Sequence, residues 1–117
     1  MTGGDRALKV ADIDFGSENI IPAVSQDAAS GEVLMVAFMS PAALDKTLET
    51  GDAWFWSRSR QELWHKGSTS GNFLRVQSIG VNCEENSLLL KVRPSGPACH
   101  TGNRSCFYRE LDWRGKP

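Results

Sequence analysis

The sequence lacks the features that mark several classes of protein. No apolar run approaches the ~18 residues that span a bilayer, and residues 1–9 lack the apolar stretch of a signal peptide. The formal net charge of −1 gives no electrostatic footprint for nucleic acid or for an anionic membrane. We therefore expect a cytoplasmic protein that binds neither nucleic acid nor membrane.

Cysteine is scarce, and no C-x-x-C pair is present among the three cysteines. An odd number of thiols cannot pair completely in disulfides, so at least one needs another role. Cys99 and Cys106 flank a short loop bent at Gly102-Asn103, and Cys83 lies upstream. Three thiolates suit Zn²⁺ with a fourth position open to water. Free cysteine is also a common inert core residue, and spacing alone slightly favours that interpretation.

The patterning predicts one β-dominated α+β domain over residues 1–117, because this length supports a single modest core. Two apolar runs, residues 20–26 and 33–39, surround a glycine-containing turn and predict a β-hairpin. A second hairpin is expected from residues 73–83 and 87–93, turning at Glu85-Asn86. Further strands are expected over residues 53–59 and 106–113.

A helix is predicted to begin at Ser40-Pro41, with serine as N-cap and proline in the first turn, and to end at Gly51. The predicted domain thus consists of two hairpins and one or two helices. Residues 1–18 are expected to form a loose lead-in and residues 113–117 a tail.

Residues 60–72 combine glycines, hydroxyl side chains and basic residues. Backbone N–H groups, hydroxyls and nearby cations are what a phosphate monoester needs from a binding loop. The segment lacks the G-x-x-x-x-G-K-[ST] order of a P-loop. A solvated surface loop explains the same composition equally well.

Jointly, these residues resemble phosphoribosyl-AMP cyclohydrolase. The shared series comprises W-S-R-S-R at 56–60, L-W at 63–64, K-G at 66–67, T-S-G at 69–71, Cys83, G-P-A-C-H-T-G at 96–102 and R-S-C-F at 104–107. The likeness covers nearly the whole domain, from about residue 20 to residue 108. The family hydrolyses the C6–N1 bond of the adenine ring of phosphoribosyl-AMP in histidine biosynthesis, giving ring-opened formimino-AICAR ribotide (ProFAR).

The resemblance implies one Zn²⁺ per subunit, bound by Cys83, Cys99 and Cys106 and shared across an intertwined homodimer. A strand-based estimate separates the first cysteine from the second by roughly 13 Å within one chain, which supports sharing without requiring it. His100 is the candidate general base or proton shuttle. His65 is expected to be a surface residue.

The resemblance also implies substrate-binding residues and a magnesium site. The expected substrate contacts are Arg58, Ser59, Arg60, Trp64, Lys66, Gly67, Thr69, Ser70, Gly71 and Arg104. The family usually has three aspartates around the first cysteine, where this chain has Asn82, Glu84 and Asn86. On a strand these alternate residues would share a face, but the reduced charge predicts a weakened Mg²⁺ site.

Two other functions are compatible with the thiols. A small structural-zinc binding module without catalysis is disfavoured by the open fourth ligand position. A redox thiol protein is disfavoured by the missing C-x-x-C pair.

Overall fold

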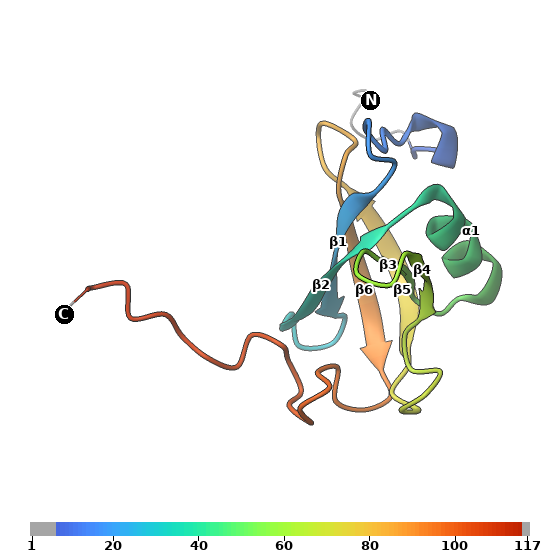
Figure 1. Cartoon of the computed structure of the whole chain (residues 1–117). Helices are drawn as coiled ribbons and strands as arrows, with labels where there is room; N and C mark the ends of the chain where they lie inside the picture. Colours follow the sequence, from blue (N-terminus) through green and yellow to red (C-terminus); the bar gives the residue numbers. More distant parts are fainter. Residues whose placement is uncertain (1–6, 116–117) are drawn as a thin grey trace.

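The computed structural model describes residues 7–115, which form a small, mostly β domain around one curled sheet (Figure 1). The six strands of the sheet lie in the order β4-β3-β2-β1-β6-β5. In chain order the elements are η2 (Val10–Asp12, a 3-10 helix), β1 (Ile21–Asp27), β2 (Val33–Met39), α1 (Pro41–Thr50), β3 (Trp54–Ser57), β4 (Glu62–His65), β5 (Leu74–Val81) and β6 (Leu88–Pro94). The expected β-dominated α+β class is confirmed.

Both predicted hairpins and the predicted helix are present. β1 pairs antiparallel with β2, and β5 pairs antiparallel with β6. The Ser40 hydroxyl accepts a hydrogen bond from the Ala43 N–H at 3.2 Å, and Gly51 ends α1 in the left-handed region at φ +80°. These are the N-cap and C-cap that local sequence chemistry dictates.

The central pairing of the sheet was not predicted. β1 lies parallel to β6, with Ala23 opposite Leu88 and Asp27 opposite Val92. This pairing joins the two hairpins into one sheet, and α1 covers one face of it. Phe55, Leu34 and Leu74 are fully buried and belong to the hydrophobic core.

Three sequence-based boundaries are wrong. Residues 106–113 form no strand but continue as exposed coil away from the body (Figure 1). Residues 62–65, assigned to the basic loop, form β4. In the described part of the lead-in, Ile13 and Phe15 pack against the core, because η2 turns the chain back onto the sheet.

The two ends of the sheet differ in what they carry. At one end lie the β1–β2 turn, the loop after β4 and the cysteine loop; at the other lie η2 and the β5–β6 turn (Figure 1). Within residues 7–115, no helix is long and apolar enough to cross a membrane.

Candidate functional site

The loop of residues 98–106, here called the cysteine loop, is closed by its own backbone. The Ala98 N–H donates to the Arg104 carbonyl, and the Cys99 N–H donates to the Asn103 carbonyl, both at 3.1 Å. Gly102 supplies the reversal at φ +92°. The chain therefore reverses direction within the loop, and this reversal brings Cys99 and Cys106 close together.

The cysteine loop is also fixed to the start of β2. The Cys106 N–H donates to the Leu34 carbonyl at 2.7 Å, and the buried Ser105 hydroxyl donates to the Val33 carbonyl at 2.7 Å. These bonds place Cys106 beside the sheet, so the thiols sit on a rigid element.

The two thiols lie close together but have different environments. The Thr101 hydroxyl donates to Cys99 Sγ at 3.0 Å and lowers the pKa of the Cys99 thiol. Desolvation of the sulfur is the main cause that raises the pKa of the Cys106 thiol, and the nearby Cys99 adds to it. The residue as a whole is nevertheless exposed. One thiol is thus prepared to ionise before the other.

Lys66 lies beneath this pair. Its residue is only 7% exposed, and burial lowers the pKa of its ammonium group, while the nearby Cys106 and Cys99 oppose that change. A buried cation next to two thiols favours their ionised form, which is the form that binds metal. The sequence had suggested only a phosphate contact for this lysine.

A cavity of about 240 Å³ opens between the cysteine loop and the loop that follows β4. Its lining residues are Trp64, Lys66, Gly67, Thr69, Ser70, Asn72, Cys99, His100 and Gly102. Gly67 is required there, because at φ +98° an added Cβ would lie 2.7 Å from the Phe73 backbone. His100 and Cys99 line the same cavity.

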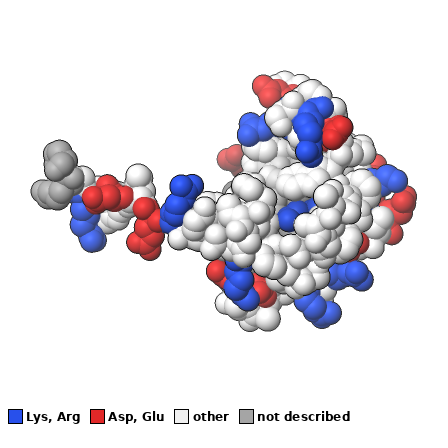
Figure 2. All heavy atoms as spheres, turned by 60° about the horizontal axis from the view of Figure 1, so that its bottom comes forward, with Lys and Arg blue, Asp and Glu red and all other residues white. Residues whose placement is uncertain are grey.

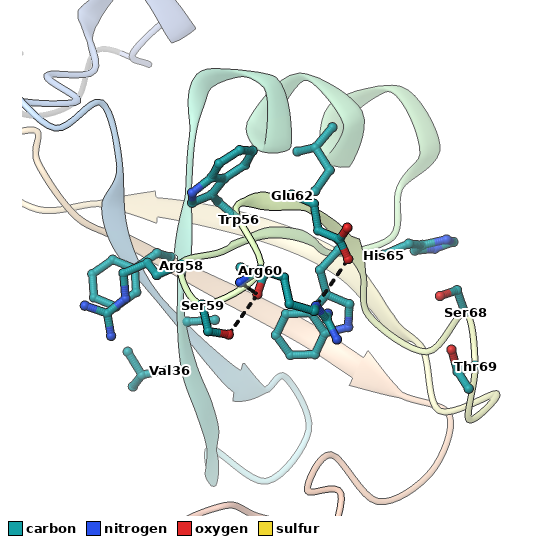
Figure 3. A pocket seen from close by; sticks show the side chains of 14 residues that line it. Val36, Trp56, Arg58, Ser59, Arg60, Glu62, His65, Ser68 and Thr69 are labelled. Carbon is teal, nitrogen blue, oxygen red and sulfur yellow. Dashed lines mark hydrogen bonds and ion pairs between the residues drawn. The ribbon is translucent and has the colours of Figure 1, made fainter.

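A larger groove of about 1100 Å³ runs over β2, β3 and β4 (Figure 3). Arg58, Ser59 and Arg60 line it, and Trp64 and Thr69 line both the groove and the smaller cavity. Arg58 lies over the Phe38 ring at 4.0 Å, while Arg60 pairs with Glu62 at 3.2 Å. The two cavities therefore adjoin, with Cys99 and Lys66 in the smaller one and two arginines in the larger one.

Two of the expected substrate contacts do not line this site within the described residues. Gly71 belongs to the turn beside it, where its N–H donates to the Gly67 carbonyl at 2.7 Å. Arg104 instead pairs with Asp27 at 3.1 Å and Glu32 at 2.9 Å. The carboxylate of Glu32 is the main cause that raises the pKa of the Arg104 guanidinium, and Asp27 adds to it. This arginine therefore anchors the cysteine loop to the β1–β2 turn.

Cys83 lies far from the other two cysteines. It is exposed in the β5–β6 turn, at the opposite end of the molecule from the cysteine loop (Figure 1). β6 alone spans about 20 Å between these ends at ~3.3 Å per residue. Among the described residues, no group of three or more His, Cys, Asp or Glu side chains is placed to hold a metal ion.

The suggested magnesium ligands occupy a turn and not a strand. β5 ends at Val81, and Asn82 Oδ1 accepts hydrogen bonds from the N–H groups of Asn86 and Ser87 at 2.8 and 2.9 Å. The Asn82 amide also donates to Asn86 Oδ1 at 2.7 Å. Asn82, Glu84 and Asn86 therefore do not share one face of a strand as predicted, because the two asparagine side chains hold the turn and bond to one another.

His65 is not the surface residue that the sequence suggested. Its ring stacks on Trp54 with centroids 4.4 Å apart, and its Nε2 lies 3.4 Å from Asp52 Oδ2. It is also among the residues that line the groove (Figure 3). The half-buried ring belongs to the packing under α1, since β4 alternates its side chains between the two faces.

Sequence reasoning assigned no role to Thr101, Asp27 or Glu32. Thr101 carried a local signal, because a hydroxyl two residues after a cysteine in a glycine turn can bond back to it. Asp27 and Glu32 carried none. They looked like ordinary turn residues, and their partner Arg104 lies more than seventy residues away in the chain.

Comparison with known proteins identifies relatives over most of the chain. The family model described as phosphoribosyl-AMP cyclohydrolase matches residues 35–108. A phosphoribosyl-AMP cyclohydrolase of Clostridium botulinum is 58% identical over 100 residues, covering 85% of this chain and 91% of that protein. A phosphoribosyl-AMP cyclohydrolase of Haloquadratum walsbyi is 52% identical over 101 residues, covering 86% of this chain and 76% of that protein. The histidine biosynthesis bifunctional protein HisIE of Bacillus subtilis is 55% identical over 104 residues, covering 88% of this chain and 50% of that protein.

Proposed function

Because this chain belongs to the phosphoribosyl-AMP cyclohydrolase family of hydrolases, we propose that it opens the adenine ring of phosphoribosyl-AMP in histidine biosynthesis. Water adds to C6, the C6–N1 bond breaks, and a proton passes to N1, which gives the ring-opened formimino-AICAR ribotide (ProFAR). The observation that carries the proposal is the meeting of Cys99, the buried Lys66 and His100 at one cavity, with the thiol of Cys106 close to the lysine and to Cys99.

The adjoining groove supports a substrate of this shape. Phosphoribosyl-AMP carries two phosphate groups, and the groove offers the exposed guanidinium groups of Arg58 and Arg60 with the hydroxyls of Ser59 and Thr69. Trp64 lines both compartments, so its ring can stack on the purine while the phosphates extend into the groove. Lys66, Gly67 and Ser70 then line the reacting end.

The donor set fits Zn²⁺ only if a second copy of the chain takes part. Cys99 and Cys106 lie close together in the cysteine loop, but Cys83 lies at the other end of the molecule. In a homodimer, Cys83 of one subunit would complete the pair in the other, giving one zinc per subunit and leaving the fourth position open. Bound there, Zn²⁺ would supply a Lewis acid that activates water toward C6 of the purine.

The residues around the thiols provide the remaining chemistry. His100 accepts the proton that water releases and returns one to N1, because it lines the cavity beside Cys99. Thr101, and to a smaller extent Lys66, lower the pKa of Cys99 and so favour its ionised form. Weak Mg²⁺ binding at Asn82, Glu84 and Asn86 is expected only with substrate phosphates present, since two of the three side chains are neutral amides.

The ligand set is tested by replacing each thiol. Cys83→Ala, Cys99→Ala and Cys106→Ala should each remove zinc and turnover together, measured by metal analysis and by the ultraviolet change of phosphoribosyl-AMP. Full zinc occupancy in any one variant removes that residue from the set. Zinc without turnover in the wild-type protein would instead favour a structural-zinc module.

Sharing between subunits is tested by mixing inactive variants. Cys83→Ala mixed with Cys99→Ala should recover activity after subunit exchange, because mixed dimers contain one intact site. Cys99→Ala mixed with Cys106→Ala is the matched control, since both lesions fall in the cysteine loop and no mixed dimer has an intact site. Equal results from the two mixtures would place the site within one chain.

A further inference from the structure

Residues 107–115, here called the arm, leave the cysteine loop as exposed coil and carry large apolar side chains (Figures 1 and 2). Phe107 is 61% exposed, Leu111 83% and Trp113 72%. Clustered exposure of this kind on a small domain marks an interaction surface. Most of the arm, from residue 109 onward, lies beyond the part of the chain that the family model matches.

An apolar groove lies at the opposite end of the molecule. η2, α1 and the upper parts of β5 and β6 enclose a cavity of about 120 Å³, lined by Val10, Ile13, Leu48, Ile79 and Val81 among others. Leu48 is 53% exposed, so α1 turns an apolar side chain outward at this place. Within residues 7–115 the groove is therefore open to solvent.

The groove lies next to Cys83. Val81 lines the groove and stands only two residues before Cys83, about 7 Å at ~3.3 Å per residue. In the dimer proposed above, the partner's cysteine loop must come to Cys83, so the partner's arm starts there. Leu111 and Trp113 follow Cys106 by five and seven residues, within reach of about 16 and 23 Å.

We propose that the arm of each subunit docks in the groove of a second copy of this chain, with Leu111 and Trp113 as apolar anchors. The docked arm holds the cysteine loop of its own subunit against Cys83 of the second copy. The inference rests on the shared site of the proposed function. The docking explains both the exposed arm and the open groove by one kind of contact. In a two-fold symmetric dimer this contact occurs twice.

The contact is tested by the dissociation constant of the zinc-loaded full-length dimer, from sedimentation over a dilution series. Leu111→Gln with Trp113→Gln should raise this constant about tenfold or more, because apolar anchors carry most of the energy of such contacts. Leu48→Gln in the groove should act in the same direction. If the wild-type constant is too small to measure, faster subunit exchange replaces it as the readout.

Matched controls introduce the same side chain outside the contact. Arg109→Gln with Glu110→Gln in the arm, and Glu49→Gln beside Leu48 on α1, should leave the dissociation constant within about twofold of wild type. Combining the arm and groove variants should weaken the dimer no more than the stronger of the two alone, since both remove one contact.

Three results would overturn the inference. The arm and groove variants could leave dimerisation unchanged, their effects could add in full, or trypsin could be slow at Arg109 and Arg114 in the dilute monomer, which would mean that the arm folds on its own chain. Zinc content and phosphoribosyl-AMP turnover of the wild type separate this failure from failure of the proposed function. A zinc-loaded, active dimer indifferent to the arm rejects the docking alone.

Discussion

The guanidinium of Arg104 lies 3.1 Å from the carboxylate of Asp27, which stands 77 residues earlier in the chain. Glu32 accepts from the same guanidinium at 2.9 Å. The pair joins the cysteine loop to the β1–β2 turn, at the end of the molecule where the two thiols lie. Loop position therefore depends on a charge contact as well as on backbone bonds.

This contact predicts a pH-dependent stability. The pKa of Asp27 lies below its ordinary 3.8, mainly because its carboxylate accepts a hydrogen bond from the Ala29 N–H. The Ser30 N–H and the Arg104 guanidinium lower it further. A lowered folded-state pKa contributes stability above the unfolded pKa and loses it as pH falls through the folded one. Asp27→Asn should therefore melt at a lower temperature than wild type at pH 7, with the difference closing below pH 3.8.

Glu32→Gln is the control for that comparison. Its carboxylate is 41% exposed against 10% for Asp27, and exposed pairs contribute at most about 1 kcal/mol. Its melting temperature should change less at every pH. A gap between Asp27→Asn and wild type that is the same at pH 3 and pH 7 would contradict the assignment.

The Thr101 hydroxyl predicts the reactivity of Cys99. Thr101→Val removes the 3.0 Å bond to Cys99 Sγ, so the pKa of that thiol should rise. In metal-free protein, alkylation of Cys99 by iodoacetamide should then slow at pH 7 and recover as pH increases. Thr101→Ser keeps the donor and should react like wild type, and equal rates for Val and Ser would rule the bond out.

The β5–β6 turn predicts how magnesium binding can be restored. Asn82→Asp with Asn86→Asp replaces the 2.7 Å amide bond between these side chains by two like charges. The metal-free variant should melt at a lower temperature than wild type, and Mg²⁺ should reverse the loss because carboxylates are its preferred protein ligands. Calorimetry without substrate should detect Mg²⁺ binding by the variant and only weak binding by wild type.

Zinc content is the control, since Cys83 is unchanged in that variant. Tight Mg²⁺ binding by wild-type protein, or no gain in the variant, would contradict the prediction.

Two glycines separate steric from conformational effects at the cavity. Gly67 and Gly71 both have positive φ, but an added Cβ meets the Phe73 backbone only at Gly67. Gly71→Ala should cost about 1–2 kcal/mol, the usual cost of the left-handed region. Gly67→Ala should cost more in chemical denaturation, because backbone must move, and equal losses would show that the close approach is relieved elsewhere.

The sequence by itself determined the parts whose causes are local. The β1–β2 hairpin, α1 with its Ser40 cap and Gly51 end, and the reversal at Gly102 depend on residues a few positions apart. The shared order of motifs identified the family, which the comparisons confirm. Zinc, magnesium and the dimer stay predictions.

Only the tertiary structure decided which distant segments meet. The parallel pairing of β1 with β6 sets the sheet order and joins the two hairpins into one sheet. It also brings the Asp27 turn to Arg104. Such contacts are chosen by the burial of whole sheet faces, and a single strand's pattern specifies that it has a buried face without specifying its neighbour. That is why local patterns predicted the hairpins but not the sheet that joins them.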